Sequence, residues 1–211
     1  MRMSILLEKL WMENREFVTT KDIKEYCKLM KLNHKSVIHY FIKRKSLVRI
    51  FRGIFYVKSL EEFKLGKSKY NHLELVAKGL ELKGVKNWYF GLHTALKHNN
   101  MTHEYFTIDE VISDTLFRAN PINIAGYRFK FIKLSPSLLE FGIEKKEMLH
   151  YSDPEKTILD FVYLSRHDGM TSDKIVMDVG DWIRDISKNK LHKYAMKYPK
   201  TVGKTAELII K

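Results

Sequence analysis

Cysteine is nearly absent from this 211-residue chain, which contains only Cys27. A single cysteine excludes an intramolecular disulfide framework and a cysteine-rich zinc site. The sequence also lacks an H-E-x-x-H motif, a glycine-rich phosphate loop, a G-x-S-x-G motif and a recognisable catalytic triad. Nine histidines are present, but His93, His98 and His103 are spaced by five, so they cannot share one face of a helix. We therefore expect no metal ion, no cofactor and no catalytic residues.

Long hydrophobic runs are missing as well. The N-terminal stretch 1–17 begins with a charge, but its apolar run is short and is interrupted by Glu8, Lys9 and Glu13. This pattern is not that of a signal peptide, and no run approaches the length of a transmembrane helix. The apolar fraction of 45% is ordinary for a globular protein with a sizeable core. We expect a cytoplasmic protein with no membrane partner.

Acidic residues are absent between Glu25 and Glu61. The same interval contains nine basic residues, which are Lys28, Lys31, Lys35, Lys43, Arg44, Lys45, Arg49, Arg52 and Lys58. Over the whole chain, 38 Lys and Arg residues face 25 Asp and Glu residues, which gives a formal net charge of +13. Such an excess indicates a polyanionic partner, most simply nucleic acid. Residues 1–63 hold fourteen basic and seven acidic residues, so the excess extends beyond them.

The basic interval is predicted to form a winged helix-turn-helix, preceded by an amphipathic helix at 4–14 whose expected buried residues are Ile5, Leu6, Leu10 and Trp11. Thr19-Thr20 is an N-cap signal for the next helix, which carries apolar residues at positions 23, 26, 27 and 30. A turn at 31–33 leads to a second helix, capped by Asn33, with the apolar stripe Val37, Ile38, Phe41 and Ile42. Two β-rich runs, 47–50 and 54–57, then form a hairpin, in which Gly53 can take a positive φ angle.

The outward face of the second helix carries the candidate DNA contacts. A helix of this length fits the major groove of B-DNA, and a hairpin with an arginine at its tip can reach the backbone or the minor groove. The residues expected to enter the major groove of DNA are Lys35, Ser36, His39, Tyr40 and Lys43. The residues expected to contact phosphates, because they flank the helix end and the hairpin, are Arg44, Lys45, Arg49 and Arg52. A protein-interaction adaptor with a basic face for an acidic partner is an alternative.

Residues 59–70, with Gly66 and Ser68, are the best candidate for a linker. We therefore place the winged helix at 1–63 and a second, mixed α/β domain at 67–211. Its expected strands are 87–91, 104–109, 127–134 and 139–143, and its expected helices are 71–83, 93–99, one starting at Ser152 or Asp153, 171–187, 190–197 and 201–210. The predicted fold class is thus α+β, with an N-terminal winged helix-turn-helix, a mixed α/β domain and a helical C-terminal end.

Two short patterns could belong to a nuclease. Glu81-x-Lys83 and Glu144-x-Lys146 each place a glutamate two residues before a lysine, and Asp109-Glu110 lies between them in sequence. Such tripeptides arise by chance in a chain that is 30% charged, and Lys83 at a helix end also complements the helix dipole. We expect no enzyme, and a nuclease with a winged-helix targeting module is the alternative.

Three stretches carry a family resemblance when they are taken in order. They are Thr19 to Val57 with its hairpin Arg52-Gly53-Ile54-Phe55-Tyr56, the element Tyr89-Phe90-Gly91-Leu92-His93-Thr94-Ala95-Leu96, and the helix start Asp153-Pro154-Glu155-Lys156-Thr157-Ile158-Leu159-Asp160. Together they resemble the AbiEi-type antitoxins, which are transcriptional regulators of bacterial and archaeal antiviral defence loci. The resemblance covers 17 to about 165 and departs from the family at Asn99-Asn100-Met101-Thr102, where a glycine is usual before the threonine.

The resemblance implies a repressor that binds inverted repeats in double-stranded DNA upstream of its own operon. It also implies the antitoxin role in an abortive-infection type toxin-antitoxin system, with a nucleotidyltransferase-like toxin as partner. It implies no catalytic residues. Both a monomer in solution and a dimer on DNA are left open.

Overall fold

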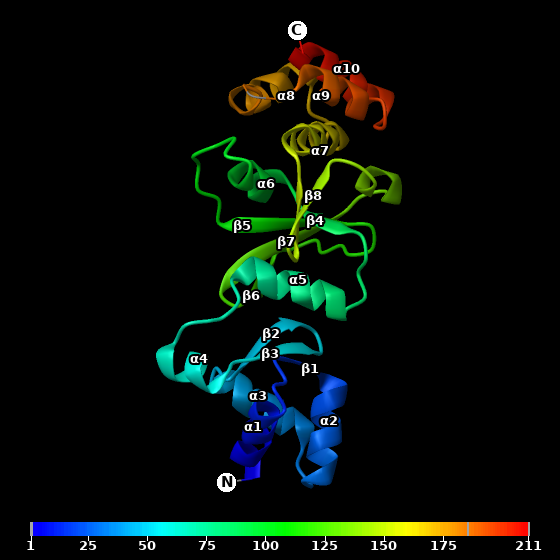
Figure 1. Ribbon diagram of the computed structural model, residues 1–211. Coiled ribbons are helices and arrows are strands. Elements are labelled where there is room, and N and C mark those ends of the chain that lie inside the picture. The colour runs from blue at the N-terminus through cyan, green and yellow to red at the C-terminus, as the bar shows by residue number, and fades with distance from the viewer. Residues whose placement is uncertain (1, 185, 211) are drawn as a thin grey trace. The chain divides into compact units, whose positions relative to one another are not determined.

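The computed structural model describes residues 2–184 and 186–210 (Figure 1). The chain divides into two compact units, of which the first is Met1–Gly84 with Asn123–Gly126 and the second is Val85–Ile122 with Tyr127–Lys211. The expected α+β fold class is confirmed. A winged helix-turn-helix comes first, and a mixed α/β part with a helical C-terminal end follows.

The first unit begins with the elements of a winged helix-turn-helix. These are α1 (Arg2–Met12), β1 (Phe17–Thr19), α2 (Thr20–Leu29), α3 (His34–Lys43), β2 (Leu47–Phe51) and β3 (Ile54–Val57), and the strands form an antiparallel sheet in the order β1-β3-β2. Both helix starts follow their sequence signals, because Thr19 accepts the N–H of Asp22 and Asn33 accepts those of Lys35 and Ser36. The short strand β1 is an addition to the predicted elements.

Apolar side chains of α1, α2 and α3 pack on one face of this sheet. The buried cluster consists of Leu6, Leu10, Val18, Ile23, Cys27, Val37, Ile38, Phe41, Leu47, Phe55 and Val57. Ile5 was expected in this core but is 47% exposed, whereas Leu6 and Leu10, one helical turn apart, face inward. Burial raises the pKa of the Cys27 thiol, so this cysteine is a small core residue.

The stretch after the hairpin is folded onto the first unit and does not act as a linker. Ser59 caps α4 (Leu60–Leu65), which ends at Gly66 with a left-handed φ of 68°. The next helix, α5 (His72–Leu82), packs on β2 and β3, on the face away from α1–α3 (Figure 1). A Cβ atom on Gly79 would lie 2.5 Å from Ile50, so glycine permits this close approach. The first unit therefore extends to Gly84, where the sequence had suggested a boundary near Gly66.

A buried carboxylate holds this stretch to the hairpin. Glu62, 8% exposed, accepts hydrogen bonds from the Tyr56 hydroxyl at 2.6 and 2.7 Å and from the backbone N–H groups of Ser59 and Lys69. Burial alone would raise the pKa of Glu62, but these hydrogen bonds outweigh burial and lower the pKa below its usual 4.5. Tyr56 belongs to β3, so the carboxylate links α4 to the centre of the sheet.

The second sheet has the strand order β6-β7-β5-β4-β9-β8. Its strands are β4 (Trp88–Phe90), β5 (Ile108–Ser113), β6 (Ile122–Ile124), β7 (Tyr127–Lys133), β8 (Ile143–Lys146) and β9 (Leu149–Ser152). Strand β4 is antiparallel to β5 and parallel to β9, while β5 is parallel to β7. The remaining elements are α6 (Leu92–His98), η1 (Pro136–Leu139), α7 (Pro154–His167), α8 (Ser172–Val179), η2 (Gly180–Trp182), α9 (Lys188–Ala195) and α10 (Lys200–Ile210).

Several predicted elements of the second unit differ from the structure. The strand expected at 104–109 begins only at Ile108, where its pairing with Arg128 of β7 starts. No strand spans the described residues 139–143, where one was expected, because η1 ends at Leu139 and β8, which pairs with β9, begins only at Ile143. The helix expected at 171–187 ends at Val179. Helix α7 starts in the second of the two possible registers, with Asp153 as N-cap and Pro154 in the first turn.

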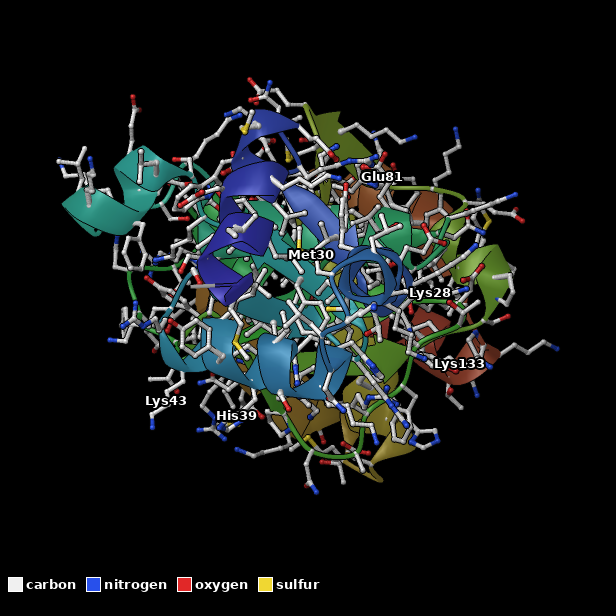
Figure 2. The ribbon with its side chains drawn as sticks, turned by 90° about the horizontal axis from the view of Figure 1, so that it is seen from below. Lys28, Met30, His39, Lys43, Glu81 and Lys133 are labelled. Atoms are coloured by element: carbon white, nitrogen blue, oxygen red, sulfur yellow. The ribbon has the colours of Figure 1, made fainter. Side chains whose placement is uncertain are left out.

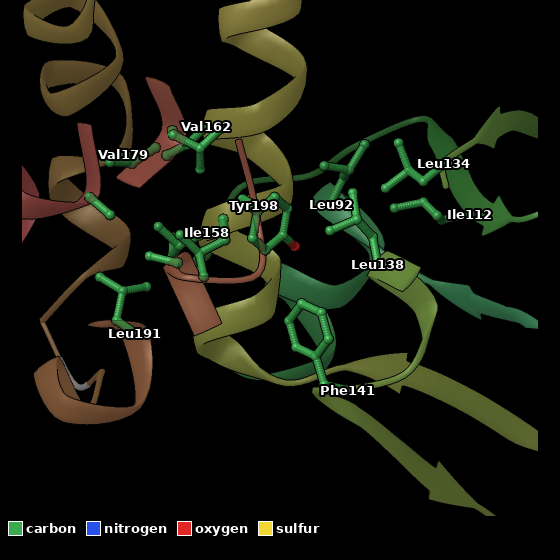
Figure 3. Close-up of a cluster of buried hydrophobic side chains, with 14 of the residues drawn as sticks. Leu92, Ile112, Leu134, Leu138, Phe141, Ile158, Val162, Val179, Leu191 and Tyr198 are labelled. Carbon is green, nitrogen blue, oxygen red and sulfur yellow. The ribbon is translucent and has the colours of Figure 1, made fainter. Parts of the chain in front are cut away.

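Helix α7 is the centre of the second core. Its residues Ile158, Leu159 and Val162 are fully buried, and α7 packs against β9 and helices α8–α10. Figure 3 shows Ile158 and Val162 within this cluster. Figure 3 shows Tyr198 among the same apolar side chains. Trp88, Tyr89 and Phe90 of β4 are also buried.

An ion pair lies inside this core. Lys156 Nζ is 2.7 Å from Asp160 Oδ1, and both side chains are 0% exposed. The hydroxyls of Tyr89 and Tyr198 each donate to Asp160 at 2.7 Å, and Lys156 Nζ lies 5.0 Å from the ring centroid of Phe141. Burial lowers the pKa of Lys156, and Asp160 opposes that shift. Each member of the buried pair is therefore compensated by polar or aromatic neighbours.

Lys156→Ala should lower the free energy of unfolding by about 3–5 kcal/mol, because it leaves Asp160 buried without its cation. Lys174 and Asp178 provide a matched control, since they form the same i,i+4 pair at 2.9 Å but are exposed. Lys174→Ala should therefore lower the free energy of unfolding by less than about 1 kcal/mol. Urea unfolding followed by circular dichroism measures both values, and equal losses would contradict the role of burial.

Glu62→Gln should lower the melting temperature at pH 7 and flatten its dependence on pH. Because the folded pKa lies below 4.5, the carboxylate stabilises the fold above that pH, and this contribution is lost as the pH falls through the folded pKa. Thermal unfolding from pH 7 to pH 3 measures the effect, with Glu61→Gln, at an exposed neighbour in α4, as the control. A Glu62→Gln profile parallel to that of the wild type would refute the assignment.

Candidate nucleic-acid interface

Helix α3 presents a polar face to solvent. Val37 and Phe41 anchor the opposite side of the helix in the core, where both are no more than 1% exposed. Lys35, Ser36, His39 and Lys43 are exposed and Tyr40 is half-buried. Figure 2 shows His39 and Lys43 pointing away from α3 and from the core. All five residues that the sequence assigned to this face therefore lie outside the fully buried core.

A groove of about 600 Å³ separates α3 from the hairpin. It is lined by Thr20, Lys35, Ile38, His39, Ile42, Arg49, Arg52, Gly53 and Phe55. Every charged side chain in this lining is basic, and the apolar members come from α3 and β3. The groove therefore combines a cationic rim with an apolar floor.

The hairpin fixes the arginines on one side of the groove. Arg49 pairs across the strands with Phe55, and its guanidinium carbon lies 5.6 Å from the centroid of that ring. Phe55 itself is 2% exposed and part of the helical core, so it is a fixed platform for Arg49. At the tip, Gly53 has a φ of 83° and its carbonyl accepts the N–H of Thr20 at 2.9 Å. This bond ties the wing beside Arg52 to the start of α2.

The groove brings together four of the nine predicted DNA contacts: Lys35, His39, Arg49 and Arg52. The other five lie outside its lining. Ser36 and Lys43 are on the outward line of α3, Arg44 stacks on Tyr40 at 5.3 Å, and Lys45 is in the exposed turn before β2. Sequence reasoning did not single out Thr20 and Phe55 as groove residues. The cross-strand pairing of Phe55 with Arg49, which follows once Gly53 is taken as the turn, is a signal that could have identified Phe55.

The positive charge is concentrated in the first unit. Its residues include nineteen Lys and Arg against nine Asp and Glu, a formal net charge of +10. The second unit has nineteen against sixteen, a net charge of +3. The division at Gly84 thus assigns most of the excess to the unit that contains the groove.

The acidic residues considered for a nuclease have local structural partners or lie on the surface. Glu81 forms an ion pair with Lys78 at 2.9 Å. Glu110 accepts the N–H of His93 at 2.9 Å and lies 3.0 Å from its Nδ1 atom, so it caps the start of α6. Glu144 is exposed on β8. In residues 2–184 and 186–210, no three His, Cys, Asp or Glu side chains come together to hold a metal ion.

The fold has a counterpart among solved structures. The chain is similar to the crystal structure of the Rv2827c protein from Mycobacterium tuberculosis, with a TM-score of 0.61 and 12% sequence identity, over 99% of this chain and 76% of that chain. At this identity the likeness concerns the fold alone. No family model matches the sequence, and no curated protein does. Over the described residues, no helix is both long enough and apolar enough to span a membrane.

Proposed function

We propose that this protein binds double-stranded DNA through α3 and the β2–β3 hairpin and acts as a sequence-specific transcriptional regulator. The observation that carries the proposal is the convergence of Lys35, Arg49 and Arg52 on one groove beside the exposed face of α3. An unbroken positive field of this kind attracts phosphates, while a free helix face can read base edges in the major groove. The lack of acidic residues from 26 to 60 adds to that field.

We further propose that the regulator is the antitoxin and autorepressor of a toxin-antitoxin operon. This rests on the order of the three stretches that resemble AbiEi-type antitoxins, at 19–57, 89–96 and 153–160. The operator would be an inverted repeat upstream of the gene, and the protein partner would be a nucleotidyltransferase-like toxin. In this proposal the protein is not an enzyme and acts in the cytoplasm.

Arg52→Ala should weaken binding to specific and random DNA by the same factor, because we expect Arg52 to contact phosphate, and phosphate contacts carry no sequence information. The slope of log affinity against log salt should become shallower by about 0.9, the value for one phosphate contact. Fluorescence anisotropy at rising salt, with the DNA upstream of the gene and a scrambled duplex as probes, measures both quantities. Lys64→Ala, an equal charge change on α4, is the control and should leave the slope unchanged.

The wild-type protein in the same titration tests the function itself. A preference of about a thousandfold for the upstream DNA is at the low end for specific regulators and would support a self-regulating repressor. Equal and steeply salt-dependent binding to both duplexes would contradict sequence-specific regulation and leave a general DNA binder. No binding at low salt would overturn the proposal in favour of an adaptor for an acidic protein.

A further inference from the structure

We infer that the groove between α3 and the hairpin holds the sugar-phosphate backbone that separates the two DNA grooves. As a consequence, Lys35 and His39 contact the DNA backbone. Ser36 and Lys43, which lie on the adjacent side of α3, contact the bases. This inference rests on the proposed DNA binding. It adds which of the helix residues determine specificity and which only position the protein.

The first argument is the geometry of the duplex. A recognition helix occupies the major groove, and a hairpin beside it can reach the adjacent minor groove. Neighbouring grooves are separated by one sugar-phosphate backbone, so a protein that occupies both must accommodate that backbone between its helix and its hairpin. In this protein the space between α3 and the hairpin is the groove of about 600 Å³.

The second argument is the chemistry of the lining. A DNA backbone presents charged phosphate oxygens together with the apolar faces of deoxyribose. The groove offers the matching pair, because Lys35, Arg49 and Arg52 supply positive charge while the half-buried Ile42 supplies apolar surface, backed by the buried Ile38 and Phe55. The stacking of Arg49 on Phe55 orients a guanidinium group with five N–H donors before DNA binds.

The third argument is the position of each residue around α3. Successive residues of an α-helix are about 100° apart, so Ser36 and Lys43 lie about 20° apart on one line. Lys35 and His39 lie about 40° apart on the neighbouring line and are the exposed α3 residues that line the groove. Tyr40 lies beyond Ser36, on the side away from the groove, and Arg44 stacks on its ring. The line of Ser36 and Lys43 is thus left to face the base edges.

The test uses the full chain with Lys35→Gln, His39→Gln and Arg49→Gln, and measures anisotropy with the upstream and the scrambled duplex across a salt series. Lys35→Gln and Arg49→Gln should each make the log–log salt slope shallower by about 0.9 and weaken both duplexes by the same factor. His39→Gln should leave the preference for the upstream duplex within about twofold. Arg49→Lys keeps the charge and should keep the slope, and Lys64→Gln on α4 is the control for a charge change outside the groove.

The reading of bases is tested with Ser36→Ala and Lys43→Gln in the same titration. At least one of them should change the preference for the upstream duplex by about tenfold, the effect of a lost base contact.

A tenfold change in preference for His39→Gln or Lys35→Gln would overturn the inference, and so would an unchanged slope for Arg49→Gln and Lys35→Gln together. In both cases the wild type still binds the upstream DNA, so these failures are distinct from a failure of DNA binding. Thermal unfolding identifies any variant that has lost its fold, and the remaining variants decide the result.

A chemical probe provides an independent arm of the test. Upstream duplexes that each carry one neutral methylphosphonate linkage remove phosphate charges singly. One linkage should weaken the wild type and have no further effect on Arg49→Gln, because the variant no longer makes that contact. If every linkage weakens the wild type and Arg49→Gln equally, Arg49 does not contact a phosphate and the inference is wrong.

Discussion

Burial of strand β3 on both faces is the constraint that positions the candidate interface. All four of its residues are buried, with Phe55 and Val57 in the core formed with α1–α3. Tyr56 is held through its hydroxyl by Glu62, and α5 packs on the face of the sheet away from that core. A hairpin exposed on one face could rock relative to α3, whereas one packed on both sides cannot move without opening a core. The width of the groove is therefore set by the hydrophobic packing of β3.

The second unit and the basic interval 26–60 of the first unit use charge in different ways. In the second unit, Lys156 lies in the core and is compensated there by Asp160, while Lys190 bridges Asp153 and Glu155. Among the residues that the structure describes, the ion pairs of Lys and Arg side chains lie outside the interval 26–60. The cations of α3 and the hairpin thus remain available to a polyanion, whose condensed counterions they would release. Charge in the second unit thus contributes to internal structure, whereas the unpaired charge of 26–60 is the charge that our proposal assigns to DNA binding.

Local signals predicted the winged helix well because its helix starts depend on local chemistry. Thr19 and Asn33 act as caps within three residues of their own positions, and the apolar stripe of α3 follows from helical periodicity. The close packing of α5 on the hairpin depends on contact between Gly79 and Ile50, which are far apart in sequence, so it could not be predicted locally. Nine site residues were predicted from charge and exposure. Their division into four that line the groove and five that do not required the register that sets Arg49 on Phe55.

Fold and function are carried by different parts of this sequence. A likeness of TM-score 0.61 at 12% identity means that two chains can share an architecture while nearly all of their side chains differ. Core positions need only suitable volume and periodicity, so they tolerate such divergence. A groove that combines Lys35, Arg49 and Arg52 around Phe55 requires particular side chains at particular registers. The chemistry of that groove, and not the fold around it, is therefore the basis for proposing DNA as the partner.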